Sequence, residues 1–278
     1  GSVANALKRI FVNVNVTIVD VNTSQGSQLA ELHNLSLLPA YLFDSSVVQN
    51  SVFQTFAGNL KQSNGKYLLN TLDSTSGYLF RNLPSQEPEL VQFVTTYDVN
   101  SLLFQNTTFN VLAKFNNSIN YAPRYVVTRE NNTIKSINGY IELVEALVQL
   151  CSIESGSTNA VNAIKCRSRE ILQCYNESQI APGFCAQFWK VCVGGWDVNE
   201  TFVEQCIKQR NNTILLGQLQ FAVDNQINLV PTTIIGNQYR FVGQLSEFEL
   251  LSTICAVYPG LSGCVISVGV RSTNSTVS

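Results

Sequence analysis

The sequence predicts a mixed α/β protein built from two units, of which the second is cross-linked by disulfides. Short apolar runs with a period of two alternate with segments of helical spacing along the 278 residues. An apolar run, a proline and a second apolar run occur together twice, at 34–46 and at 226–237. All eight cysteines lie after residue 150, so the two halves are stabilised differently.

The first half contains expected strands and helices in the order β-α-β-α-β. Residues 9–20 (RIFVNVNVTIVD) alternate apolar and polar side chains, which is typical of a strand with one buried face. We then expect a helix at 27–33, a strand at 35–43 interrupted by Pro39, a helix at 47–60 and a strand at 66–70. His33 closes the first of these helices, where we expect it to cap the last carbonyls or to be exposed.

Two prolines and few apolar residues at 82–89 mark the boundary between the units. Beyond it the pattern predicts a strand at 90–98, a helix at 100–115, a strand at 124–130, a helix at 141–151, a helical cysteine-rich block to about 222 and a helix at 246–258. We therefore divide the chain into residues 1–88, residues 89–264 and an extended C-terminal strand or tail, 265–278.

Composition points to a secreted protein. Charged residues make up 13% of the chain and the net charge is −2, so no basic patch exists for a nucleic acid. No run of about 20 apolar residues could cross a membrane, and the absence of Met predicts a mature form whose signal peptide was removed. N-linked glycans are predicted at ten N-x-S/T sites: Asn15, Asn22, Asn34, Asn106, Asn116, Asn131, Asn176, Asn199, Asn211 and Asn274.

The cysteines predict a disulfide framework and an extracellular or cell-surface location. They are Cys151, Cys166, Cys174, Cys185, Cys192, Cys206, Cys255 and Cys264. None forms a C-x-x-C motif and His33 is the only histidine, so we expect neither a metal nor a cofactor. Eight cysteines allow roughly 105 connectivities, which the sequence leaves open.

The segment VPTTIIGNQYRFVGQLSEFELLSTIC resembles the second half of the thioredoxin superfamily. Pro231 and Thr232 match its cis-proline loop, and Gly243 precedes the last helix. Residues 89–264 resemble the branch of DsbA and the gamma-interferon-inducible lysosomal thiol reductase, with a helical insertion at about 140–222. Residues 9–70 look like a further unit around a second cis-proline loop at Pro39. The resemblance implies tandem thioredoxin-like units, the second with a disulfide-rich helical insertion.

The sequence departs from that family at the redox motif. Active members carry C-x-x-C where the first helix begins, because the helix N-terminus stabilises a thiolate. Residues 97–101 (Tyr-Asp-Val-Asn-Ser) occupy this place here, so a dithiol mechanism cannot operate there. Glu142 and Glu145 lie three residues apart, but we expect them on the solvated face of a helix rather than as an acid/base pair. No catalytic residue is assigned.

These observations favour a non-catalytic structural or adhesive subunit that self-associates into cell-surface filaments through its terminal strands. Two alternatives stay open. One is an extracytoplasmic thiol-disulfide oxidoreductase or redox chaperone that uses a relocated cysteine pair between Cys151 and Cys206. The other is a monomeric module that binds an extended peptide at the Pro231 strand edge.

Overall fold

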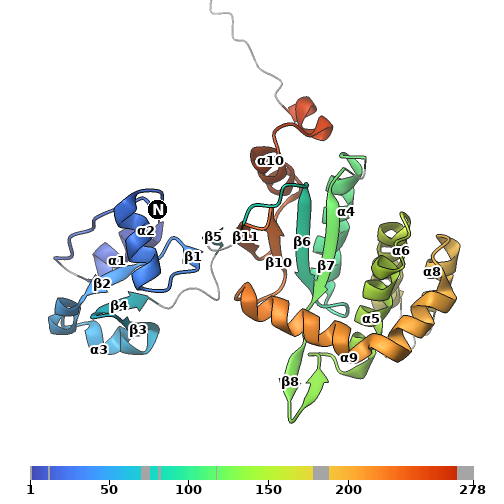
Figure 1. Cartoon of the computed structure of the whole chain (residues 1–278), viewed down its shortest axis with the longest axis horizontal. Helices are drawn as coiled ribbons and strands as arrows, with labels where there is room; N and C mark the ends of the chain where they lie inside the picture. Colours follow the sequence, from blue (N-terminus) through green and yellow to red (C-terminus); the bar gives the residue numbers. More distant parts are fainter. Residues whose placement is uncertain are drawn as a thin grey trace, which may run out of the picture. The chain divides into compact units, whose positions relative to one another are not determined.

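The computed structural model describes residues 2–11, 13–69, 76–80, 83–116, 118–177 and 188–267. The chain divides into two compact units, Gly1–Leu83 and Pro84–Ser278. Figure 1 shows the elements of each unit coloured along the sequence.

The first unit combines short helices with short antiparallel strands. Its helices are α1 (Ser2–Ile10), α2 (Ser24–Leu32) and α3 (Phe53–Phe56), with 3-10 turns at Ser45–Gln49 and Ala57–Asn59. Its strands are β1 (Leu37–Leu38), β2 (Leu42–Asp44), β3 (Leu60–Ser63), β4 (Lys66–Leu69) and β5 (Gly77–Leu79). Strands β2, β4 and β3 form an antiparallel sheet in that order, and β1 pairs with β5. A small aromatic core contains Phe11, Phe43 and Phe56.

The strand predicted at 9–20 is wrong in the described residues. Helix α1 runs to Ile10, and residues 14–20 belong to no helix or strand. Val16 is 40% and Ile18 is 91% exposed, so the alternating pattern does not mark a buried face. His33 is the C-cap residue of α2, as predicted, and its backbone N–H donates to the Leu29 carbonyl at 3.1 Å. The alternative prediction, that His33 is exposed, is wrong. His33 is 3% exposed, and its Nδ1 lies 3.2 Å from Ser63 Oγ.

The second unit is organised around four strands in the order β11-β10-β6-β7. They are β6 (Glu89–Val94), β7 (Asn120–Tyr125), β10 (Thr232–Ile235) and β11 (Tyr239–Val242). Strands β6 and β7 are parallel, and β10 is antiparallel to both β6 and β11. The strand predicted at 124–130 is instead the end of β7 followed by a separate hairpin, β8 (Thr128–Glu130) with β9 (Thr133–Lys135).

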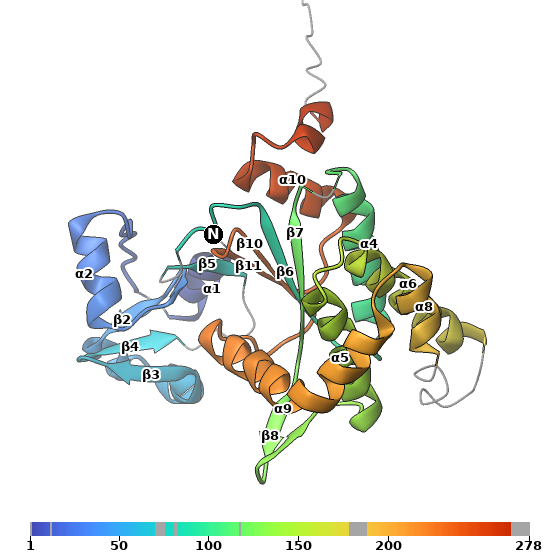
Figure 2. The same ribbon diagram turned by 45° about the vertical axis from the view of Figure 1, so that its right-hand side comes forward.

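Helices surround this sheet, and most of them come from one long segment between β9 and β10. They are α4 (Val99–Ala113), α5 (Tyr140–Glu154), α6 (Ala160–Glu177), α8 (Trp189–Gly195), α9 (Glu200–Asp224) and α10 (Glu247–Val257), with a final 3-10 turn at Ser262–Ser267. Figure 2 shows α5, α6 and α8 beside one another, with α9 returning from α8 towards β10. None of the helices in the described residues is long and apolar enough to cross a bilayer.

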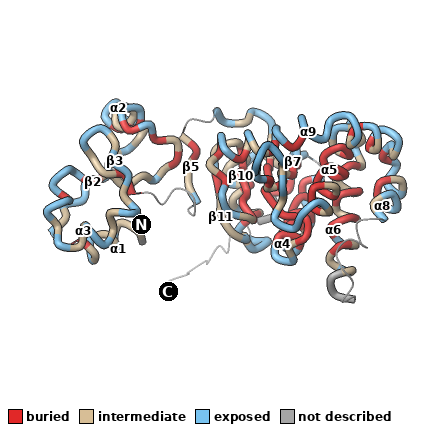
Figure 3. The backbone as a smooth tube through the Cα atoms, turned by 90° about the horizontal axis from the view of Figure 1, so that it is seen from below, coloured by how far each residue is buried: buried red, intermediate tan, exposed pale blue. Residues whose placement is uncertain are grey.

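The core of the second unit is mainly apolar but contains buried polar side chains of both strands and helices. Leu90 and Phe93 on β6 and Ile234 on β10 are completely buried. Figure 3 colours the buried residues of this unit red. A buried chain of hydrogen bonds crosses the same region, because the Tyr121 hydroxyl donates to Gln92 (2.9 Å) and accepts from Gln105 (3.0 Å). Every polar atom in this chain has a partner, which removes most of the cost of burying it.

The solvated positions predicted for Glu142 and Glu145 are wrong, since both side chains are at most 2% exposed. Glu145 receives two hydrogen bonds from the buried guanidinium of Arg167, at 2.6 and 3.1 Å. A carboxylate can be buried when a charged donor satisfies it in this way. The helix face that carries them is therefore part of the core.

The two predicted terminal strands were the basis for expecting self-association. The first of them is not a strand, as described above. In the C-terminal segment 265–278, residues 268–278 lie outside the described residues, and the preceding residues belong to the 3-10 turn Ser262–Ser267.

Candidate functional site

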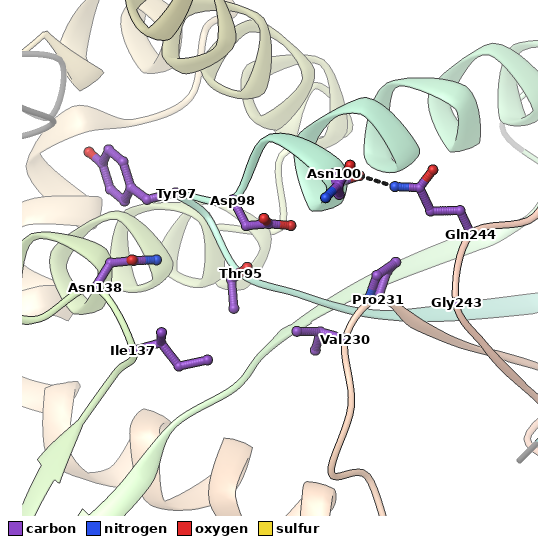
Figure 4. A pocket seen from close by; sticks show the side chains of 10 residues that line it. All are labelled: Thr95, Tyr97, Asp98, Asn100, Ile137, Asn138, Val230, Pro231, Gly243 and Gln244. Atoms are coloured by element: carbon purple, nitrogen blue, oxygen red, sulfur yellow. Dashed lines mark hydrogen bonds between the residues drawn. The ribbon is translucent and has the colours of Figure 1, made fainter. Parts of the chain in front are cut away.

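A pocket of about 460 Å³ opens beside the cis-proline loop that precedes β10. Its walls come from four segments that are far apart in the sequence (Figure 4). The lining residues are Thr95, Tyr97, Asp98, Asn100, Ile137, Asn138, Val230, Pro231, Gly243 and Gln244. The end of β6, the loop before α5, the loop before β10 and the turn after β11 therefore meet here.

The first wall is the junction of β6 and α4. Asp98 is the N-cap of α4, and its carboxylate accepts a hydrogen bond from Ser101 N at 2.7 Å. This hydrogen bond caps the N-terminus of α4. The negative charge of Asp98 is also favourable at this position, because the N-terminus is the positive end of the helix dipole. No sulfur atom is among the lining groups, so the pocket can bind but cannot exchange thiols.

The second wall is the cis-proline loop. The Val230–Pro231 peptide bond is cis, and the Pro231 carbonyl accepts a hydrogen bond from Gly243 N at 2.8 Å. Gly243 has φ +92°, a conformation that favours glycine. The Thr232 hydroxyl donates to the Leu229 carbonyl at 2.6 Å. This hydrogen bond stabilises the loop that contains Val230 and Pro231.

The backbone of Val230 is the open part of this wall. Val230 lies one residue before Pro231 and outside the registered pairs of β10 with β6 and β11. Its amide and carbonyl have no hydrogen-bond partner among the described residues. A strand end with free backbone groups can pair with an added extended chain.

Glu142 links two walls of the pocket by hydrogen bonds. Its buried carboxylate accepts hydrogen bonds from Thr96 N (3.0 Å) and Asn138 N (2.9 Å). These amides belong to the end of β6 and to the loop before α5. Glu142 is thus a positioning residue. The sequence pattern did not identify this role, because the spacing of residues in a helix does not show that a side chain will accept hydrogen bonds from two backbone amides elsewhere in the chain.

The remaining lining groups are polar and mostly uncharged. Asp98 is the one lining side chain charged at neutral pH. Across the opening, Gln244 Nε2 donates to the Asn100 carbonyl at 3.0 Å, as drawn in Figure 4. The pocket therefore offers amide and hydroxyl groups, together with an open backbone edge, to a ligand.

Of the residues selected from the sequence, Pro231 lines the pocket and Thr232 directly follows it. Pro39, the other predicted cis-proline, is also cis but is exposed between β1 and β2 of the first unit. The glycosylation candidates are not gathered at the pocket. The exposed ones among them are Asn15, Asn22, Asn34, Asn116, Asn131, Asn199 and Asn211. Asn106 is half-buried, the side chain of Asn176 is not described and Asn274 lies outside the described residues.

The cysteines lie away from the pocket and form disulfides. Cys151–Cys206 joins α5 to α9, Cys166–Cys192 joins α6 to α8, and Cys255–Cys264 joins α10 to the final turn. Cys174 is also disulfide-bonded, whereas Cys185 lies outside the described residues. No cysteine in the described part of the chain is free, which fits an oxidising compartment.

The second unit thus combines the strand order β11-β10-β6-β7 with a cis peptide bond before Pro231. No protein-family model matches the chain, and no curated protein matches it. Solved structures resemble it at low identity. DsbA2 of Wolbachia pipientis, a thiol-disulfide exchange protein, is 14% identical over 62% of this chain and 82% of its own, with a TM-score of 0.45. DsbA of Xylella fastidiosa, an oxidoreductase, is 13% identical over 66% and 91%, with a TM-score of 0.46.

A third structure is Proteus mirabilis DsbA with a non-covalently bound peptide, at 14% identity over 66% of this chain and 94% of that chain, with a TM-score of 0.43. The resemblance to the DsbA branch is confirmed, while the tandem arrangement of two such units stays a prediction. The prediction of a non-catalytic structural or adhesive subunit is wrong by this comparison, because the similar structures are thiol-disulfide oxidoreductases.

Proposed function

We propose that this chain is an extracytoplasmic polypeptide-binding protein whose cis-proline pocket binds an extended segment of its ligand. The unpartnered backbone of Val230 carries the proposal, since it offers one donor and one acceptor at a strand end. An extended ligand would pair there as an added strand, while its side chains contact the polar lining. The absence of a sulfur atom among the lining groups makes this binding non-covalent.

Location and modification belong to the same proposal. The chain is extracellular or exposed on a cell surface, where its disulfides persist and where exposed sequons such as Asn15, Asn22 and Asn199 receive N-linked glycans. Expression through a eukaryotic secretory pathway, followed by intact mass before and after enzymatic deglycosylation, tests the modification. A single mass equal to that of the bare chain in both samples would exclude the glycans.

The binding test uses reduced, carboxymethylated α-lactalbumin, an unfolded polypeptide that has no free thiol. We expect saturable binding that is lost in Asn138→Trp, because the indole fills the pocket from an exposed loop position. Asn110→Trp is the matched control, since Asn110 is an exposed α4 residue that does not line the pocket. Hydrogen exchange of the complex should protect Val230. Equal binding by both variants would refute the proposal.

Thiol-disulfide exchange at Cys166–Cys192 is a second candidate function, favoured by the partial exposure of one of its two cysteines. Cys166 is half-buried, whereas Cys192 is completely buried, and a Glu170 carboxylate oxygen lies within 4.8 Å of both sulfur atoms. The thiolate of a partner dithiol would attack Cys166 Sγ and release Cys192 as a thiolate, which takes up a proton. The partner's second thiol would then displace Cys166, so that the partner is oxidised and this pair reduced.

Stepwise reduction separates the two candidates. We expect graded dithiothreitol, alkylation and peptide mass spectrometry to show Cys166–Cys192 reduced before Cys151–Cys206, whose cysteines are both buried. A Cys166→Ser/Cys192→Ser variant should lose any disulfide-exchange activity but still bind the unfolded polypeptide. If no pair reduces before the protein unfolds, the exchange candidate is excluded and the binding proposal is unaffected.

A further inference from the structure

A second hollow, the apolar groove, lies in the same unit but shares no lining residue with the cis-proline pocket. It has a volume of about 440 Å³, which is within the range of small-molecule sites. The β8–β9 hairpin, the start of α5 and the middle of α9 form its walls. Figures 1 and 2 both place this hairpin beside α9 and the start of α5.

The walls of the groove are formed mainly by aliphatic side chains. Leu143, Leu147 and Leu215 are buried members of the core beneath it. Val144 and Ile207 are partly buried and line it as well. Leu216 also lines the groove, yet its side chain is 43% exposed, which leaves apolar surface in contact with water. Covering such surface with an alkyl chain is favourable.

The two helices that form the groove are covalently joined. Cys151 on α5 and Cys206 on α9 form a disulfide and are both buried, at 0% and 4% exposure. This bond limits how far the two helices can separate or slide past each other.

One positive charge lies at the groove without an opposite charge. Arg129 is the one charged residue among the lining groups, and it is paired across the hairpin with Ile134, which also lines the groove. Its Nη2 donates to Asn132 Oδ1 at 2.9 Å. No carboxylate in the described part of the chain forms an ion pair with it.

We propose that the groove binds a monocarboxylate with a long alkyl chain, of the fatty-acid class. The alkyl chain would lie on the leucine and isoleucine side chains, and the carboxylate would pair with Arg129. A single cation beside an otherwise uncharged and mainly aliphatic lining matches a ligand with one anionic head.

Titration calorimetry with dodecanoate, decanoate and octanoate tests the proposal. We expect saturable binding of dodecanoate at one site. Each methylene removed should weaken binding about fourfold, because each buried CH₂ contributes a fixed free energy. Dodecanol, which lacks the negative charge, should bind about tenfold more weakly. No saturable binding of dodecanoate would overturn the proposal, and equal binding of dodecanol would overturn the role of Arg129.

Two pairs of variants locate the ligand. Arg129→Gln should lower the affinity for dodecanoate to that for dodecanol, whereas Lys61→Gln, an exposed cation of the first unit, should change nothing. Leu216→Glu should abolish binding, whereas Val223→Glu, on the same helix and 63% exposed but outside the groove, should not. Loss of binding in both members of a pair would overturn the assignment. A dimer of the wild-type chain that Leu216→Glu dissociates would identify a second copy as the occupant instead.

Discussion

At the scale of single residues, the buried carboxylates organise the second unit. Glu142 and Glu145 lie on one helix and are both almost completely buried, yet they have different partners. Glu142 binds two backbone amides beside the pocket, and Glu145 binds Arg167. Burial of a charge is stable only when such partners are present, so each carboxylate specifies how its neighbours must lie.

Replacing Glu142 tests this positioning role. Glu142→Leu leaves the amides of Thr96 and Asn138 without acceptors, and we expect the free energy of unfolding to fall by roughly 2 to 4 kcal/mol. Urea denaturation measures the change. Glu142→Gln should recover part of the loss, because its amide oxygen can still accept one of these bonds. Equal stability of the wild type and Glu142→Leu would show that the two hydrogen bonds are dispensable.

Tyr121 gives a second prediction at this scale. Tyr121→Phe removes the hydrogen-bond partner of Gln92 Oε1 and of Gln105 Nε2, and we expect the free energy of unfolding to fall by about 1 to 3 kcal/mol. Chemical denaturation of the two proteins at neutral pH gives this difference. A change below the error of the measurement would contradict the hydrogen-bond chain described above.

The same hydroxyl also makes stability depend on alkaline pH. Burial raises the pKa of Tyr121, because the phenolate would be desolvated. The neutral Tyr121 hydroxyl contributes fully to the free energy of unfolding below the unfolded-state pKa of about 10. This contribution is lost as the pH rises from there towards the higher folded-state pKa. Ultraviolet titration should therefore show Tyr121 ionising only as the protein unfolds. This late step should be smaller by one tyrosine in Tyr121→Phe, because burial raises the pKa of Tyr125 as well.

At the scale of elements, the pattern of apolar residues predicted correctly the helices and strands that pack against the core of the second unit. It predicted a strand wrongly where no second strand pairs with the segment. The strand predicted at 90–98 is β6, and the helices predicted at 100–115, 141–151 and 246–258 are α4, α5 and α10. The apolar residues of these elements face a core, and a regular period of apolar residues indicates such a buried face. Residues 9–20 have an equally regular pattern, but an extended segment becomes a strand only when another strand pairs with it.

Helix α10 offers a prediction about its N-terminus. Ser246 and Glu249 form a capping box, in which the Glu249 carboxylate accepts from Ser246 Oγ and Ser246 N at 2.7 and 2.8 Å. These hydrogen bonds, first that of the Ser246 side chain, hold the pKa of Glu249 below its usual value. The box therefore stabilises the fold above the unfolded-state pKa and is lost as the pH falls through the lower folded-state pKa.

Thermal unfolding as a function of pH measures this effect. The melting temperature of the wild type should exceed that of Glu249→Gln at neutral pH, and the difference should shrink below the ordinary pKa of a glutamate, about 4.3. A difference that stays constant down to about pH 2, below both pKa values, would mean that the carboxylate charge does not contribute.

At the scale of the whole molecule, the two units are stabilised by different means. All eight cysteines lie in Pro84–Ser278, and the sequence of Gly1–Leu83 contains none. Cys151–Cys206 alone spans 55 residues, for which the chain-entropy model gives about 4 kcal/mol. Calorimetry with a reductant should lower the unfolding temperature of the second unit and leave that of the first unchanged. Equal shifts in both transitions would show that the units unfold together.

The sequence could predict the cis-proline loop but not the two hollows of the second unit. Pro231 was recognisable because proline in a strand context has few permitted settings. The apolar groove was not recognisable, because Arg129, Leu147 and Leu216 come together only after α5 packs on α9. Each of these residues fits the pattern expected for its own helix or hairpin. The spacing of residues along the sequence therefore does not indicate that they line one groove.

The disulfide between α5 and α9 has a kinetic consequence for the groove between them. Because the helices are already fixed in position, a ligand does not wait for them to separate before it enters. Association should then be limited by diffusion and orientation, and differences in affinity along a homologous series should be expressed as differences in residence time. The wild-type protein should exchange its ligand in a single kinetic phase, and a Cys151→Ser/Cys206→Ser variant, which lacks this disulfide, should add a slower one.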